Sequence, residues 1–185
     1  MNITYAAAKR KLDEVLFSLG LGGSKDADIV SADNMSAWKI DFDSGLASEI
    51  IKSKLKDCGG HVTVYTARGL PCEIYAEPDG KTFSCDKLPI NPNYDYAVFD
   101  VIVELLKSQG GRARKGNGRN FKLGEKGCEE NTVVGAIAKH RGRKPGESVF
   151  DPVFVMAAVL EWADIAKNGR GELILKDSYL SKYIK

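Results

Sequence analysis

The sequence lacks any long hydrophobic run and any paired-cysteine motif. Its longest uninterrupted apolar run, 153–160, has eight residues, whereas a helix that spans a bilayer needs about 20. The start of the chain lacks the charged, then apolar, then small-residue order of a secretory signal. None of the four cysteines forms a CxxC pair. We therefore expect no membrane partner and a cytoplasmic chain with reduced thiols.

Acidic residues are scarce in one stretch only. The net charge is +2, and residues 1–85 carry 10 basic and 12 acidic side chains. Residues 107–144, in contrast, carry eleven Lys or Arg against three Glu. A positive charge that is concentrated in one region attracts polyanions more strongly than the same charge spread over the surface. The charge distribution therefore predicts nucleic acid as the partner.

Hydrophobic periodicity predicts an α+β fold with N-terminal helices and a small antiparallel β-meander. The pair Asp43-Ser44 is typical of a helix cap. The prolines of 86–93 indicate a boundary, which gives an α/β-meander half, 1–88, and a basic helical half, 94–185, or one continuous domain. The elements expected before the boundary are helices over 4–19 and 43–58 and strands over 61–67, 72–77 and 81–85.

The second half is expected to be mostly helical. Its elements are helices over 94–107, 129–140 and 149–167 (the last capped by Ser148), a strand over 172–176 and a helical turn over 178–184. Residues 94–176 resemble a helix-turn-helix with a wing, the DNA-binding arrangement in which a helix enters the major groove while a wing grips the backbone. Helix 149–167 is too apolar to be an exposed reading helix, which leaves 129–140 for that role.

The strongest site signal is the segment 107–126, which holds seven Lys or Arg, five glycines and one acid, Glu125. Glycine permits close backbone approach, and arginine offers forked donors that match phosphate oxygens. The alternative is a solvated, mobile connector. The predicted nucleic-acid contacts are Arg112, Arg114, Lys115, Arg119, Lys122, Lys139, Arg141, Arg143, Lys144 and Arg170.

Two enzyme alternatives stay open in the first half. Residues 40–46, IDFDSGL, resemble the nucleophile loop of the haloacid-dehalogenase phosphatases, and 62–68 resemble that family's second motif. This resemblance implies that Asp41 attacks phosphate beside Mg²⁺ while Asp43 acts as acid or base. The other alternative is a small metal-dependent nuclease on the hairpin, built from Glu73, Glu77, Asp79 and Lys81.

A zinc site is conceivable from Cys58, His61, Cys72 and Cys85, because Cys-Gly-Gly-His has finger-like spacing. The remaining spacings do not match a zinc knuckle, and buried free thiols account for them more simply. We therefore predict neither a metal nor a cofactor.

Residues 110–127 and 140–175 together resemble small proteins of bacterial mobile elements and the anti-CRISPR inhibitors of RNA-guided (type II) nucleases. The resemblance implies a non-enzymatic protein that binds nucleic acid, DNA in preference to RNA, or an RNA-guided nuclease complex. A further alternative is a dimeric interaction scaffold, since the apolar helix 149–167 could pair with a second copy.

Overall fold

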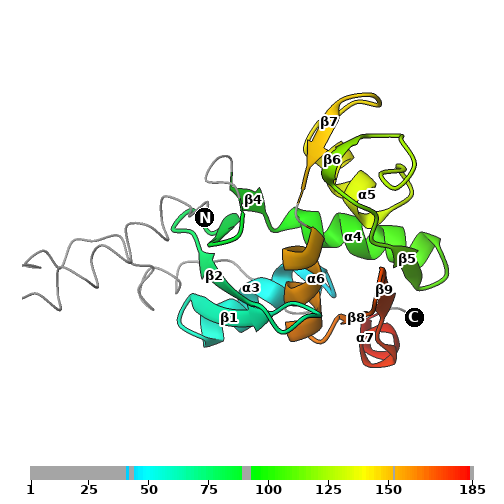
Figure 1. Cartoon of the computed structure of the whole chain (residues 1–185). Coiled ribbons are helices and arrows are strands. Elements are labelled where there is room, and N and C mark those ends of the chain that lie inside the picture. The colour runs from blue at the N-terminus through cyan, green and yellow to red at the C-terminus, as the bar shows by residue number, and fades with distance from the viewer. Residues whose placement is uncertain (1–40, 42–43, 89–92, 152, 184–185) are drawn as a thin grey trace, which may run out of the picture.

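The computed structural model describes residues 41, 44–88, 93–151 and 153–183. Helices and antiparallel sheets alternate along the chain (Figure 1), so the predicted α+β class is confirmed. The helix expected over 4–19 lies outside the described residues. Among the helices described, none combines the length and hydrophobicity needed to cross a bilayer.

The predicted meander is confirmed, with each strand within two residues of its expected ends. Its strands pair antiparallel in the order β1-β2-β3-β4. The fourth strand comes from beyond the expected boundary at 86–93, so both halves of the chain contribute to one sheet. The elements are α3 (Ala47–Asp57), β1 (His61–Tyr65), β2 (Pro71–Ala76), β3 (Thr82–Cys85) and β4 (Tyr94–Asp95).

The first helix of this region begins later than the sequence suggested. Its N-cap is Leu46, which makes no side-chain capping bond. Instead, the Ser44 hydroxyl accepts from the Leu46 N–H at 3.3 Å, and the Asp100 carboxylate accepts from the Ser48 N–H at 2.9 Å. A carboxylate from another helix thus satisfies a free N–H of the first turn.

The basic half contains more strands than expected. The segment 107–126, predicted to be a loop, holds two strands, and the predicted helix 149–167 is really a strand, a shorter helix and a second strand. Ser148 lies in the first of these strands, opposite Lys122, so it does not cap the helix. The elements are α4 (Ala97–Ser108), β5 (Arg112–Arg114), β6 (Arg119–Lys122), α5 (Val133–His140), β7 (Ser148–Phe150), α6 (Val153–Trp162), β8 (Ala166–Asn168), β9 (Glu172–Leu175) and α7 (Asp177–Tyr183).

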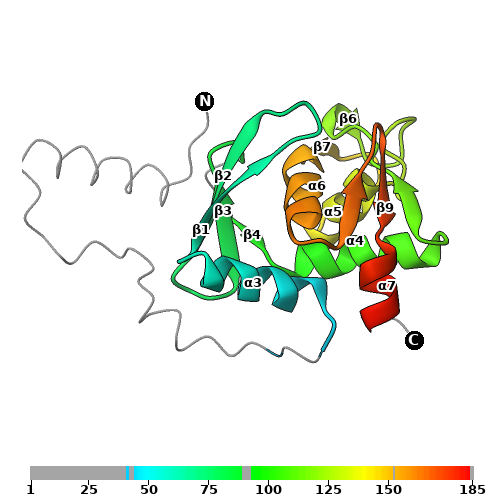
Figure 2. The same ribbon diagram turned by 90° about the horizontal axis from the view of Figure 1, so that it is seen from below.

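These strands form two small sheets. β5, β9 and β8 pair antiparallel in that order, and β6 pairs with β7. The β8–β9 hairpin projects away from α7 (Figure 2). The β6–β7 ribbon rises on the side of α4 opposite α7 (Figure 1). Residues that are close together in the basic segment 107–126 therefore belong to two different sheets.

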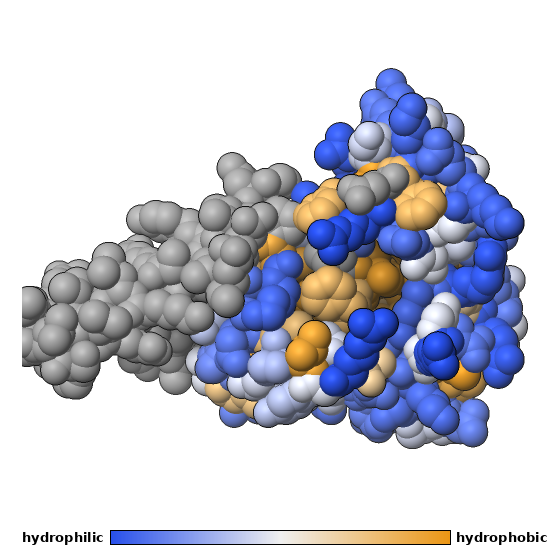
Figure 3. Space-filling model, in the orientation of Figure 1, coloured by the Kyte–Doolittle hydropathy of each residue, from blue (hydrophilic) through white to orange (hydrophobic). Residues whose placement is uncertain are grey.

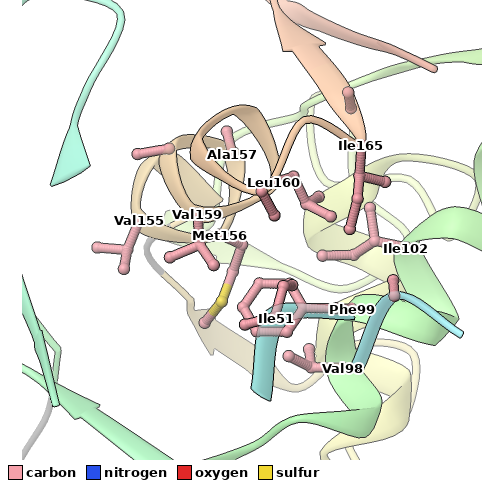
Figure 4. Packing of buried hydrophobic residues seen from close by; sticks show 14 of the residues in the cluster. Ile51, Val98, Phe99, Ile102, Val155, Met156, Ala157, Val159, Leu160 and Ile165 are labelled. Carbon is pink, nitrogen blue, oxygen red and sulfur yellow. The ribbon is translucent and has the colours of Figure 1, made fainter. Parts of the chain in front are cut away.

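One hydrophobic core joins the two halves. Ile51 of α3 and Phe83 of the meander share a buried cluster with Phe99 of α4 and Met156 of α6 (Figure 4). Every residue of 155–160 is at most 1% exposed. The prediction that this apolar helix is no exposed reading helix is thus confirmed. The hydrophobic side chains of 155–160 are covered within the same chain, and the predicted homodimer stays a prediction.

Candidate nucleic-acid interface

The glycines of the basic segment lie in packed turns. A Cβ on Gly116 would stand 2.7 Å from the Thr132 hydroxyl oxygen, and one on Gly118 would stand 2.6 Å from the Asp151 carbonyl oxygen. Both distances are too short for real Cβ contacts. The backbone here is held as well, because the Val134 N–H at the start of α5 donates to the Lys115 carbonyl at 3.0 Å. The loop over α5 is therefore packed and hydrogen-bonded.

Two other glycines close to basic residues, Gly111 and Gly142, lie where helices end. The Gly111 N–H donates to the Leu106 carbonyl at 2.8 Å, which closes α4 in the Schellman manner. Gly142, with φ of 79°, follows the last turn of α5, and the Arg143 N–H donates to the Ala138 carbonyl at 2.9 Å. The glycine content thus follows from local backbone geometry and does not by itself indicate phosphate binding.

The predicted cations lie mostly in four basic turns, RARK (112–115), GNGR (116–119), RGRK (141–144) and NGRG (168–171). The first and the last of these meet at the β5–β9–β8 sheet. β5 lies beside β9, and the Lys115 N–H donates to the Gly171 carbonyl at 2.8 Å. Within the sheet, Ile174 of the central strand β9 lies directly opposite Arg112 of β5 on one side and Lys167 of β8 on the other. Such neighbours project from the same face, while Ala113 and Leu173 are buried on the opposite face.

We call the outward surface the cationic sheet face. It is formed by Arg112, Arg114, Lys167 and Arg170, all of them exposed.

Most of these cations form no ion pair within the part of the chain that the structure describes, although Glu172 of β9 lies directly opposite Arg114 and projects from the same face. Among the described residues only Arg114 of this face forms an ion pair, 3.4 Å from Glu129, and its side chain remains 66% exposed. Exposed pairs of this kind contribute only about 0–1 kcal/mol. The Arg114 guanidinium can therefore exchange its carboxylate for a phosphate at little cost.

Lys115, a predicted phosphate contact, is instead used inside the fold. Its ammonium donates to the Asn168 side-chain oxygen and, at 2.6 Å, to the Gly169 carbonyl. Burial of the amine lowers the Lys115 pKa, although the nearby Glu161 carboxylate opposes this shift. The side chain thus connects β5 to the β8–β9 turn and offers little free charge to a ligand.

The other two basic turns meet at the second sheet. The Leu123 N–H, just after β6, donates to the Glu147 carbonyl at 2.9 Å, and the Gly146 N–H donates back to the Leu123 carbonyl at 2.8 Å. These bonds bring the loop after α5 to the end of the β6–β7 ribbon. The exposed cations gathered here are Arg119, Lys122, Arg143 and Lys144.

Two predicted contacts, Lys139 and Arg141, are paired with carboxylates. The Lys139 ammonium lies 2.7 Å from Glu130. The Arg141 guanidinium lies 3.9 Å from the centre of the Tyr94 ring and 3.6 Å from the buried Asp151 carboxylate. Tyr94 donates its hydroxyl to that carboxylate at 2.5 Å, and its burial raises the Tyr94 pKa. Arg141 therefore belongs to a partly buried network.

A shallow depression of about 220 Å³ lies beside this network. The His140 imidazole lies 2.9 Å from the Asp95 carboxylate on its rim, and Val98 of α4 also lines it. The Val98 N–H donates to Asp95 at 3.1 Å, so this carboxylate already serves the start of α4. Sequence reasoning missed the pair because 45 residues separate its members.

The acidic residues of the hairpin have structural partners. Asp79 accepts from the backbone N–H groups of Lys81 and Thr82, each at 2.8 Å, which makes it a turn-forming residue. Glu73 lies 2.7 Å from His61. Within the described ranges, no three His, Cys, Asp or Glu side chains are grouped so as to hold a metal ion.

The cysteines and the proposed aspartate loop are the remaining predictions. Cys72 and Cys85 are buried on neighbouring strands, whereas Cys58 is exposed. Of the aspartate pair, Asp41 is hydrogen-bonded through its N–H to Glu49 at 3.1 Å, and Asp43 lies outside the described residues. The phosphohydrolase alternative stays a prediction.

The structure thus groups seven of the ten predicted cations in two places, leaves Lys115, Lys139 and Arg141 outside them, and adds Lys167, which the sequence missed. Lys167 was not predicted as a contact because the sequence placed it at the end of the expected helix 149–167, whereas it lies in strand β8. Figure 1 shows the β6–β7 ribbon rising on the side of α4 opposite α7, and Figure 2, turned by 90°, shows the β8–β9 hairpin extending away from α7. In comparison with known proteins, the chain matches no family model, no curated protein and no solved structure.

Proposed function

We propose that this protein binds nucleic acid through its cationic sheet face and contacts the phosphate backbone without reading base sequence. The observation that carries the proposal is the meeting of Arg112 and Arg114 with Lys167 and Arg170, although more than 50 residues separate the two pairs in the chain. Three exposed cations on one small sheet and Arg170 in its hairpin turn outnumber the two carboxylates near them, Glu129 and Glu172. They make a surface on which phosphates release their counterions.

The spacing of these cations suits a phosphate backbone. Strands lie about 4.8 Å apart and residues of one face repeat about every 7 Å along a strand. Arg112 and Lys167, two strands apart in one row, are therefore about 10 Å apart at their Cα atoms. These intervals correspond to two or three nucleotide steps of about 3.4 Å each along B-DNA.

Element order further supports the proposal. The elements follow one another in the order α4, β5, β6, α5, β7, α6, β8 and β9. If the β6–β7 ribbon is taken as an insertion on either side of α5, we infer a winged-helix-like unit in which the β8–β9 hairpin is the wing. Since α6 is buried, the unit has no free helix at that position to insert into the major groove. We therefore propose backbone contact by the wing in place of base readout.

The resemblance to inhibitors of RNA-guided nucleases gives this proposal a more specific form. Such nucleases expose guide RNA and target DNA. In that setting the cationic sheet face would bind the nucleic-acid component, and inhibition would require binding alone, without a catalytic step.

A double variant with a matched control tests the proposal. We expect Arg112→Ala combined with Arg170→Ala to weaken duplex DNA binding equally for unrelated sequences in a mobility-shift assay. The slope of log affinity against log salt should fall in magnitude by about 2, since each lost phosphate contact removes roughly 0.9. Lys56→Ala with Lys81→Ala removes the same charge from α3 and the meander and should leave the slope unchanged.

Two results would contradict the proposal. One is an absence of duplex binding at low salt by the unaltered protein. The other is an equal loss of affinity in both double variants, which would mean that net charge alone, rather than this face, governs binding.

A further inference from the structure

The β6–β7 ribbon carries an exposed aromatic side chain among cations. Phe150 lies opposite Arg119, and Lys122 lies opposite Ser148. Phe121 and Val149, also opposite one another, pack inward on a separate small hydrophobic cluster. The ribbon therefore has an anchored inner face and a free outer face.

Exposure of the phenylalanine is large. Phe150 is 59% exposed and Phe154, four residues further at the start of α6, is 44% exposed. Hydrophobic residues are visible at the surface where β7 leads into α6, with hydrophilic residues around them (Figure 3). A single exposed apolar residue is ordinary, but two close in the chain beside several cations indicate a ligand with both flat apolar surfaces and negative charge.

The cations around Phe150 are available to such a ligand. Arg119, Arg143 and Lys144 are exposed, and among the described residues none of their side chains forms an ion pair. Glu125 and Glu147, the nearest acids in the chain, accept backbone N–H bonds from Lys122 at 3.0 Å and from Lys144 at 2.9 Å. Their carboxylates are thus used to close turns.

We infer that the β6–β7 ribbon binds single-stranded nucleic acid, with Phe150 stacking on an unpaired base while Arg119 and its neighbours contact the flanking phosphates. Every base presents a π-face on which an aromatic ring can stack without sequence preference. In a duplex these faces are covered by neighbouring base pairs, so Phe150 cannot stack there. The inference rests on the proposed nucleic-acid binding and names a second, strand-selective contact within it.

The two sites can cooperate because of where they lie. β5 of the sheet face and β6 of the ribbon are consecutive strands, and only residues 115–118 lie between them. A nucleic acid that has a duplex part and an unpaired part would then meet the sheet face with the first and Phe150 with the second. The preferred ligand is therefore a junction between paired and unpaired strands.

The test uses Phe150→Ala and three probes: a 15-nucleotide oligo-dT, a duplex of equal length, and an oligonucleotide with 2-aminopurine at its centre. We expect Phe150→Ala to weaken oligo-dT binding by about 5- to 150-fold, the range measured for loss of one aromatic stack. Duplex affinity should stay within about twofold, and quenching of 2-aminopurine fluorescence by the unaltered protein should be lost. Tyr65→Ala, which removes an equally exposed ring (60%) from the β1–β2 hairpin, is the control.

The outcomes separate this inference from the proposed function. Unchanged oligo-dT affinity in Phe150→Ala, or a parallel loss for duplex and single strand, overturns the stacking site. Neither result bears on the duplex binding of Arg112→Ala with Arg170→Ala, which tests the proposed function separately. If the unaltered protein does not bind oligo-dT at low salt, the inference is also overturned. The exposed ring then serves a protein partner. Replacing dT with U shows whether DNA or RNA is preferred, and equal melting temperatures exclude a folding defect.

Discussion

Gly118→Ala is the sharpest test of whether the basic segment is a packed part of the fold or a mobile connector. In a mobile connector, replacing glycine with alanine stabilises the protein by about 0.4–1 kcal/mol, because the unfolded chain loses conformational freedom. Gly118 is buried, and its φ lies outside the left-handed region, so alanine is compatible with the backbone. Whether alanine at this position stabilises or destabilises the protein therefore depends on the atoms that surround the added Cβ.

Those surroundings leave no room for a methyl group. The added Cβ would overlap the Val134 side chain and stand 2.6 Å from the carbonyl oxygen and 3.2 Å from the nitrogen of Asp151. The valine can rotate, but the Asp151 backbone cannot yield without moving the carboxylate that holds Tyr94 and Arg141. Overpacking of this kind costs about 1–3 kcal/mol, which outweighs the gain in the unfolded state.

We therefore expect Gly118→Ala to lower the stability by about 1.3 kcal/mol, the difference between the midpoints of these two effects. At about 2–4 °C per kcal/mol for a chain of this size, the melting temperature should fall by several degrees in a circular-dichroism melt. Gly169→Ala is the matched control, because its Cβ would meet only ordinary contacts at 3.4–3.5 Å from Glu172. A melting temperature for Gly118→Ala equal to or above that of Gly169→Ala would refute the packed arrangement.

Three further predictions follow from individual side chains. Lys115→Met should lower the melting temperature, because Asn168 and Gly169 lose their donor at a cost of about 1–3 kcal/mol, yet leave the salt slope of DNA binding unchanged; a reduced slope would make Lys115 a phosphate contact. Burial raises the pKa of Tyr179 to about 12 from 10.0, so its contribution is complete below pH 10 and lost as the pH rises toward 12; the urea midpoint of Tyr179→Phe should decline less over that interval, and a parallel decline would contradict the shift. An exposed-thiol reagent should modify one cysteine, Cys58, in the folded protein and four after denaturation; rapid reaction of a second thiol would mean that Cys72, Cys85 or Cys128 is accessible.

The predicted site was partly recoverable from sequence because charge and glycine are visible without a structure. Arg112, Arg119 and Arg143 are exposed, as a charged side chain in a turn should be. Sequence could not separate them from Lys115 and Arg141. Asn168, the partner of Lys115, is 53 residues away, and Asp151, the partner of Arg141, lies beyond strand β7. Ion pairing is a property of neighbours in space, and no local pattern predicts it.

The sequence by itself determined the α+β class, the antiparallel meander, the existence of α4 and α5 and the burial of the apolar helix α6. These features follow from hydrophobic periodicity and from turn residues, which act over a few neighbouring positions. Tertiary structure alone decided the strands β5, β6, β7 and β8, because each has three or four residues and is stabilised mainly by its partner strand. It also decided which cations share a face. Strand pairing between distant segments brings Arg112 and Lys167 into one row on either side of Ile174, and that pairing depends on a register that no single stretch of the chain contains.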